Sequence, residues 1–329
     1  MVRTMSLLRA LLGDARTLRP GRPPLDGLPP EGSVLLDAPD DRLGPVLVAA
    51  ALGDHVPAAR LLAGTRHAAE WEYRDRCAVR LAAFARGRDG WLAAWCARDP
   101  GDPDALLVAA QLAVDRAWAS PARAERLREV EPTLRAAAEA APRDPVPWRI
   151  AMDHARGSRA SGASFAALWE QAVRRSSRHH GCHVSALEYL SARWRGSHRA
   201  CFDFAEAAAS DSPPGSLVRA LPLRAAYGQL VDGGDAVPGA RVDAAADLAA
   251  ELSAHYPAGD PWPAEVRNLL AYVLMARRRW TAALEQFRLI GPRATSHPWS
   301  AAAGEGGDPL GRFLEAREAA RRASARRRR

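Results

Sequence analysis

The chain of 329 residues contains no lysine: all 46 residues counted as lysine plus arginine are arginine. This absence excludes a Walker A loop, whose lysine reaches the β- and γ-phosphates of a nucleotide. It also excludes the strand lysine of protein kinases and Schiff-base chemistry, which needs an amine nucleophile. A GC-rich coding bias is the simplest cause, and the exclusions hold whatever the cause is.

Isoleucine and asparagine are nearly absent, with two isoleucines (Ile150 and Ile290) and one asparagine (Asn268). Alanine, the strongest helix former, supplies roughly a fifth of the chain. Apolar residues make up 48% and charged residues 26%, which is typical of an ordered soluble protein with a substantial core. The composition therefore predicts helices and disfavours a large sheet.

Cysteine is scarce: the four cysteines, Cys77, Cys96, Cys182 and Cys201, form no C-x-x-C pair. Four cysteines in a chain of this length do not make a disulfide framework, so we expect reduced, buried thiols. The N-terminal apolar patch is short and is interrupted by charged residues, and no apolar run reaches membrane-spanning length. These observations predict no membrane span and a cytoplasmic location.

The formal net charge of +8 is concentrated at the C-terminus. Residues 321–329 contain six arginines and no acidic residue, so the remainder has 40 basic against 38 acidic residues, a net charge of +2. A nearly neutral body lacks the broad basic surface that contacts phosphates in nucleic-acid-binding proteins. The charge distribution therefore argues against nucleic acid as the partner.

The chain divides into three parts by composition. Residues 1–40 contain a weak helical pattern at about residues 5–18 and a Pro/Gly-rich arm, which suits a linker or a wrapped segment. Residues 41–316 show helical apolar spacing almost without interruption, as in Val266, Leu270 and Val273. Residues 317–329 form an Arg-rich tail.

Five Asp-Pro pairs occur in the helical region at residues 41–316. An aspartate at the helix N-cap accepts a backbone hydrogen bond, and proline at the next position has no N–H to leave unpaired. The pairs therefore predict helix starts rather than a calcium loop, because no glycine turn with a distal glutamate follows. The aspartates of the five pairs are Asp99, Asp102, Asp144, Asp260 and Asp308.

The alternation of helix, short turn, helix and Pro-containing loop predicts helical hairpins that stack on one another. The clearest unit, residues 264–297, resembles the tetratricopeptide pattern, with Ala271 on its first helix and Ala283 and Phe287 on its second. We therefore expect an all-α fold of twelve to sixteen helices: a right-handed stack of helical hairpins, a tetratricopeptide-like α-solenoid.

A series of short strings recurs in order along the chain: Trp91-Leu-Ala-Ala-Trp95 before Asp99-Pro100 and Asp102-Pro103, Ala117-Trp118, Asp144-Pro145-Val-Pro-Trp148, Tyr189-Leu-Ser-Ala-Arg-Trp194-Arg-Gly196-Ser197, Trp280-x-x-Ala283 through Phe287, Ile290-Gly291 and Pro298-Trp299. In these strings, residues 70–300 resemble an uncharacterised bacterial family called domain of unknown function 4034. The resemblance implies a helical-repeat fold and carries no known activity or catalytic residues. One departure concerns the loop after Trp118, where Ala119-Ser120-Pro121 replaces the Arg-Gly and longer segment of the family, so no role of that loop is carried over.

Two groups of residues are candidates for function. The first is the His/Cys loop, with His179, His180, Cys182 and His183, whose side chains are suitable zinc ligands. Four ligands within five residues do not converge easily on one tetrahedral centre, so a distant residue such as His154 or His198 would have to contribute. The alternative is a polar loop between two hairpins. The spacing of Glu70, Glu72 and Asp75 predicts a solvent-exposed helix face rather than an acid–base pair.

The second group comprises tryptophans, which number ten. Most lie on predicted apolar stripes and suit core packing, while one or two could anchor a partner in a groove. The groove candidates are Trp91, Trp95, Trp118, Trp148 and Trp194.

No nucleophile elbow, dinucleotide-binding loop or paired metal motif occurs in the sequence. We therefore expect a noncatalytic scaffold without cofactor that binds a protein or peptide on a concave helical groove. The alternative is a metal-dependent enzyme centred on the loop at residues 179–183. The sequence leaves the partner's identity and the oligomeric state open.

Overall fold

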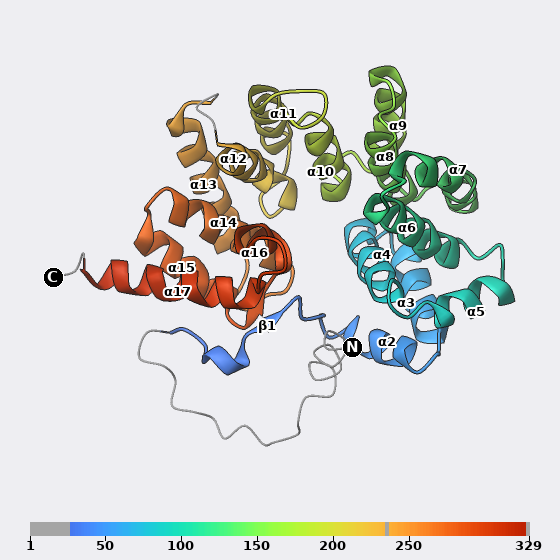
Figure 1. Cartoon of the computed structure of the whole chain (residues 1–329), viewed down its shortest axis with the longest axis horizontal. Helices are drawn as coiled ribbons and strands as arrows, with labels where there is room; N and C mark the ends of the chain where they lie inside the picture. Colours follow the sequence, from blue (N-terminus) through green and yellow to red (C-terminus); the bar gives the residue numbers. More distant parts are fainter. Residues whose placement is uncertain (1–26, 234–236, 327–329) are drawn as a thin grey trace. The chain divides into compact units, whose positions relative to one another are not determined.

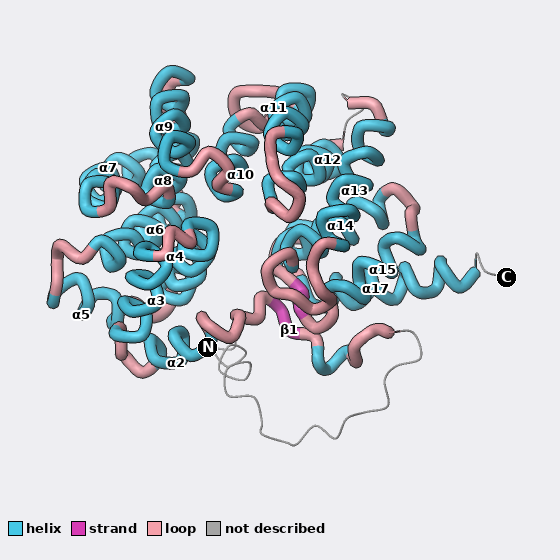
Figure 2. Tube along the Cα trace, turned by 180° about the vertical axis from the view of Figure 1, so that it is seen from behind, coloured by secondary structure: helices cyan, strands magenta, loops and turns pink. Residues whose placement is uncertain are grey.

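The computed structural model describes residues 27–233 and 237–326. Within them the protein is all-helical, with 16 α-helices that account for 72% of the structure, which confirms the predicted fold class at this level. The exceptions to helices and loops in this part of the chain are two strands of two residues each, drawn in magenta in Figure 2. Among the described residues, no helix combines the length and the apolar character needed to cross a bilayer. The helix predicted at about residues 5–18 lies outside the described residues.

The described residues group into two compact units. The first comprises residues 41–196, and the second comprises residues 197–326 together with residues 27–40. The division falls in the short Gly196-Ser197 turn. No shift in composition marks this turn, which is why the sequence predicted one domain over residues 41–316.

In the 41–196 unit, helices pack against their neighbours in sequence and against the next helix but one. Thus α4 packs on α6, α6 on α8 and α8 on α10, while α7 and α9 pair with α6 and α8 (Figure 1). The unit contains α2 (Gly44–Ala51), α3 (Val56–His67), α4 (Trp71–Ala85), α5 (Gly90–Arg98), α6 (Pro103–Ala119), α7 (Arg123–Ala140), α8 (Val146–Gly157), α9 (Gly162–Arg175) and α10 (His180–Tyr189).

The 197–326 unit repeats this order of packing, with α11 on α12, α12 on α14 and α14 on α15. The helices α16 and α17 pack together at its C-terminal end. The unit contains η1 (Glu31–Ser33), β1 (Leu35–Leu36), α11 (His198–Ser210), η2 (Leu217–Ala220), α12 (Leu221–Asp232), α13 (Gly239–Ala254), α14 (Ala264–Ala276), α15 (Trp280–Ile290), β2 (Arg293–Ala294), α16 (Ser296–Ala303) and α17 (Pro309–Arg326).

The predicted apolar stripes form the cores of both units. Val266, Leu270 and Val273 of α14 are buried, as their spacing predicts. Between α15, α16 and α17 the rings of Phe287 and Phe313 lie 5.3 Å apart at 74°, an edge-to-face geometry that favours aromatic pairs.

The Asp-Pro pairs act in two ways. The Asp102 side chain accepts hydrogen bonds from the first backbone N–H groups of α6, and Asp308 accepts one from Leu310 N at the start of α17. These two pairs start helices as predicted. Asp144 accepts from the N–H of Val146, the first residue of α8, from one position before the N-cap Pro145. Asp260 instead bonds to Trp262 N in the turn before α14, and Asp99 bonds to Gly101 N in a turn.

Residues 27–40 pack on the C-terminal end of the second unit. The strand β1 pairs in parallel with β2, with Leu35 opposite Arg293. The carboxylate of Asp37 accepts hydrogen bonds from the backbone N–H and the hydroxyl of Ser296, and Arg317 donates to Pro29 O at 2.9 Å. The end of the predicted arm is therefore a wrapped segment, fixed by residues far away in the sequence.

The segment predicted as an Arg-rich tail from residue 317 continues α17 as far as Arg326. Ala320 and Ser324 are buried, while Arg321 and Arg322 pair with Glu318 on the exposed side. The i,i+3 and i,i+4 spacing of these ion pairs suits a helix surface. The last three arginines lie outside the described residues.

Candidate functional site

Three of the four side chains in the predicted metal loop, those of His179, Cys182 and His183, make separate hydrogen bonds. His179 is the N-cap of α10: its Nδ1 accepts from Cys182 N at 3.2 Å, and its Nε2 lies 3.3 Å from Trp71 O. The Nδ1–H of His183 donates to His179 O at 3.0 Å. Both nitrogens of His179 and one of His183 are thus used in fixing the start of the helix.

Cys182 and His180 also contact protein groups near the start of α10. The Cys182 thiol is buried against Pro145 O, and burial together with the nearby Asp75 raises the pKa of the thiol well above its ordinary value, so it stays protonated. The backbone N–H of His180 donates to Glu72. Among the described residues, no group of three or more His, Cys, Asp or Glu side chains is arranged to hold a metal ion.

The distant histidines considered as fourth ligands also bond elsewhere. His154 Nε2 lies 2.7 Å from Leu127 O. His198 belongs to the other unit, where its Nε2 is 3.6 Å from an Asp232 oxygen. Residues 179–183 are therefore the N-cap and first turn of α10, with His179, Cys182 and His183 buried, and not the polar loop that the alternative interpretation predicted.

A buried ion network lies in the 41–196 unit, and the sequence did not predict it. The fully buried Arg74 of α4 donates to Asp144 at 2.5 Å and to Leu62 O at 2.8 Å, and it pairs with Asp104 at 2.7 Å. Arg66 makes two further bonds to Asp104, at 3.1 and 3.2 Å. The network ties α3, α4, α6 and the turn before α8 together.

A second set of ion pairs continues the network. Arg149 of α8 pairs with Asp75 of α4 and with Asp153 on its own helix at 3.2 Å. Ser185 of α10 donates to Asp153 at 2.9 Å. Asp75 is 8% exposed, and burial raises the pKa of the Glu72 carboxyl, so the predicted solvated face is wrong for these two residues. An arginine next to buried apolar residues, such as Arg149 beside Ile150, is the feature of the sequence that could have indicated a buried ion pair.

The groove tryptophans divide by exposure. Trp91 and Trp95 share one face, with ring centroids 6.4 Å apart, but both are 2% exposed and belong to the core around α5. They offer no surface to a partner. Trp118, Trp148 and Trp194 are partly exposed.

An arginine guanidinium lies against each of the three partly exposed rings. Trp148 is covered by Arg175 at 4.5 Å from the ring centroid. Trp118 has both Arg123 and Arg156 at 4.7 Å, and Arg156 also lies 5.4 Å from the centroid of Trp194. Cation–π contacts of this kind stabilise the position of both groups.

Trp118 and Trp194 are distant in the sequence but pack edge to face, with centroids 5.5 Å apart at 81°. Trp118 lies at the end of α6, and Trp194 lies in the turns after α10. Gly157 leaves room for the Trp118 ring, because a Cβ at this position would lie 2.8 Å from Trp118 Cζ2. We call Trp118, Trp194, Arg123 and Arg156 the Trp118–Trp194 cluster.

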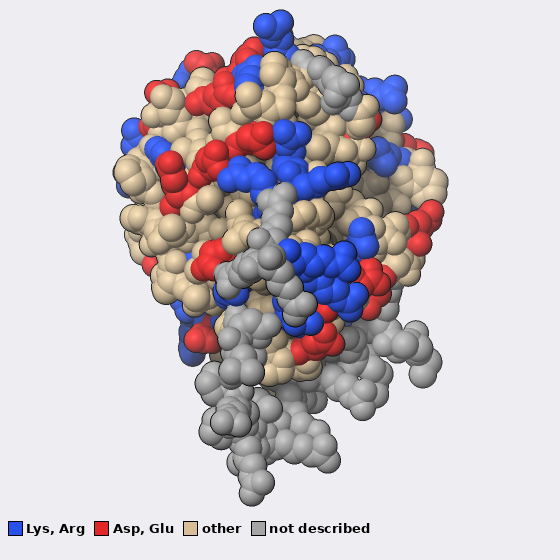
Figure 3. Space-filling model, turned by 90° about the vertical axis from the view of Figure 1, so that its left-hand side faces the viewer, with Lys and Arg blue, Asp and Glu red and all other residues tan. Residues whose placement is uncertain are grey.

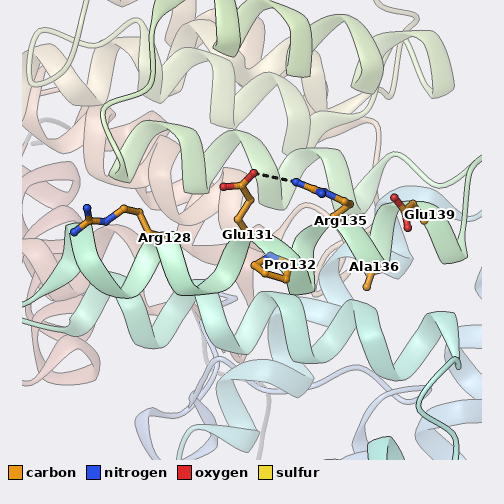
Figure 4. Close-up of a pocket in the computed structure, with 6 residues that line it drawn as sticks. All are labelled: Arg128, Glu131, Pro132, Arg135, Ala136 and Glu139. Atoms are coloured by element: carbon orange, nitrogen blue, oxygen red, sulfur yellow. Dashed lines mark hydrogen bonds and ion pairs between the residues drawn. The ribbon is translucent and has the colours of Figure 1, made fainter.

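A shallow hollow on α7 is a weaker candidate. Figure 4 shows its side chains spread along this single helix, with Glu131 bonded to Arg135 at 3.2 Å. The side chains of Glu131 and Arg135 are mostly exposed, so the hollow is open to solvent and would not enclose a ligand. It is lined by Arg128, Glu131, Pro132, Arg135, Ala136 and Glu139.

Ion pairs balance many exposed arginines. Figure 3 shows basic and acidic side chains intermixed over one face. Arg241 pairs with Asp203 and Glu206, and Arg277 pairs with Asp243 at 2.8 Å. These pairs reduce the positive potential that the arginines would otherwise present.

No family model matches the sequence, and the searches of curated proteins and of solved structures also found no significant match.

Proposed function

We propose that the protein is a noncatalytic helical-repeat scaffold that binds a segment of another protein. The observation that carries this proposal is the Trp118–Trp194 cluster, in which two partly exposed tryptophans lie together with two arginines. Tryptophan and arginine are the residue types most enriched among the energetically dominant positions of protein interfaces.

The packing order supports a stack of helical hairpins. In each unit a helix contacts both its neighbour and the next helix but one, as when α6 packs on α7 and α8. We propose a right-handed, tetratricopeptide-like arrangement for these hairpins, in keeping with the resemblance to domain of unknown function 4034. Stacked hairpins of this kind present extended binding surfaces.

The partners of the polar groups support a role without catalysis. In the predicted His/Cys loop the imidazole of His179 and the thiol of Cys182 are buried and serve the start of α10. The network around Arg74 likewise joins helices inside the 41–196 unit. A protein partner in the cytoplasm is part of this proposal.

Affinity capture from a lysate of the source organism tests the proposed function. The full chain should retain a specific protein, and Trp194→Ala should lose most of it, because truncation of an interface tryptophan commonly costs about 2 kcal/mol or more. Arg135→Gln on the exposed side of α7 is the control and should retain the protein like the wild type.

Capture by Trp194→Ala that equals capture by the wild type would contradict the proposal. Because this tryptophan packs against Trp118, circular dichroism must show that the variant keeps its helical content. If Trp194→Ala loses helical content, capture by Arg123→Gln tests the proposal instead, because Arg123 is exposed and its removal leaves the core intact.

A further inference from the structure

We propose that the Trp118–Trp194 cluster recognises an acidic peptide, with Arg123 binding a carboxylate and the tryptophan edges contacting an adjacent apolar side chain. This inference rests on the proposed function and specifies the chemistry of its partner. The arrangement of charge around the two rings carries it.

Arg123 lies at the first position of α7 and is exposed. Among the described residues no acidic group forms an ion pair with it, and Trp118 holds its guanidinium in place. A stacked guanidinium keeps the N–H donors at its edge, in the fork geometry that matches a carboxylate. Glu125 follows two residues later, about 200° around the helix, and therefore faces away.

Arg156 shares its carboxylate partner with other groups. Its Nη2 lies 3.5 Å from Asp153, but the same carboxylate also accepts from Arg149 and Ser185. The buried Nε of Arg156 has no hydrogen-bond partner in the described structure. Because Arg149 also pairs with Asp75, the two guanidiniums face two carboxylates, and the positive charge that an incoming carboxylate would offset is that of Arg123.

Two further arginines lie close together near the cluster. Arg159 follows the C-terminal end of α8, and Arg195 follows Trp194; both are exposed. The Nη2 of Arg195 donates to Arg159 O at 3.4 Å, which places the two residues side by side. A peptide with several acidic residues would meet this basic surface beyond its first contact.

The ring geometry favours a peptide over single-stranded nucleic acid. Nucleic-acid bases bind tryptophan by stacking on an open ring face. In this cluster guanidinium groups lie over both rings, and Trp118 meets Trp194 edge to face. At least one face of each ring is therefore covered, which leaves less open ring face for a base to stack on.

Fluorescence anisotropy of the full chain tests this inference with a labelled peptide, Gly-Glu-Glu-Leu-Glu-Glu-Gly, and its glutamine counterpart. The acidic peptide should bind at low salt, and the glutamine peptide should bind at least tenfold more weakly. Arg123→Gln should raise the Kd for the acidic peptide about tenfold, as expected for the loss of a hydrogen bond between charged groups. Arg126→Gln, on the same helix but paired with Glu129, is the matched control and should change the Kd less than twofold.

Equal binding of the two peptides, an equal effect of both substitutions, or no binding of the acidic peptide would overturn the inference. Tighter binding of a labelled oligo-dT strand that depends on Arg123 would assign the cluster to nucleic acid instead. These outcomes are distinct from failure of the proposed function: a partner that is captured through Trp194, although the acidic peptide does not bind, would retain the scaffold and remove only the acidic specificity.

Discussion

Replacing Arg74 with methionine should lower the free energy of unfolding by about 3–5 kcal/mol, the usual cost of breaking a buried ion pair from one side. Arg74 is fully buried, and the substitution would leave Asp144, also 0% exposed, without its cation. Burial raises the pKa of the Asp144 carboxyl despite the arginine, which shows how costly this charge is inside the protein. Urea unfolding followed by circular dichroism measures the loss.

The matched control is Arg135→Met, which removes an exposed i,i+4 pair with Glu131. Such pairs contribute less than about 1 kcal/mol, so this variant should unfold nearly like the wild type. Adding Asp144→Asn to Arg74→Met should recover part of the loss, because it removes the uncompensated charge. A loss for Arg74→Met no larger than that of the control would contradict the structural role of the network.

The second large effect is expected at Arg267 in the other unit, where methionine should again cost about 3–5 kcal/mol. This buried guanidinium donates to the carbonyls of Ser253, Tyr256, Pro257 and Leu289, at distances of 2.7 to 3.0 Å. It thereby joins the ends of α13 and α15. Each buried acceptor left without a donor costs about 1–3 kcal/mol, with partial relaxation expected.

The substitution Arg267→Lys distinguishes the contribution of the positive charge from that of the guanidinium geometry. The lysine ammonium carries three donors on one nitrogen, whereas the guanidinium reaches the four carbonyls from Nη1 and Nη2 and also donates from Nε to the Ser253 hydroxyl. Arg267→Lys should therefore remain clearly less stable than the wild type, while Arg312→Met, an exposed pair with Glu315, should not. Thermal unfolding of the three variants provides the comparison. A wild-type melting temperature for Arg267→Lys would show that the carbonyl network contributes little.

The helices were predictable because their signals are local. Apolar residues three and four apart mark the face that α14 buries, and Asp102 caps α6 through its immediate neighbours. The shared face of Trp91 and Trp95 follows from a spacing of one helical turn. These features depend only on residues within a few positions of one another.

The site depends on contacts that the sequence does not encode locally. Arg149 reaches Asp75 across 74 positions, so the acidic residues of α4 resemble a solvated face when only their own helix is considered. Likewise, nothing near Trp118 indicates that Trp194 covers it. The glycine at 157, which leaves room for the Trp118 ring, becomes informative only once both helices are placed.

Hydrogen exchange on the full chain with the acidic peptide tests the central claim most directly. Saturating peptide should slow backbone exchange around residues 118–123, at the end of α8 and in the turns around Trp194, because these segments carry the Trp118–Trp194 cluster. The same experiment with the glutamine peptide should leave exchange unchanged. Protection concentrated at residues 179–183, or absent from the cluster while the peptide is bound, would contradict the account.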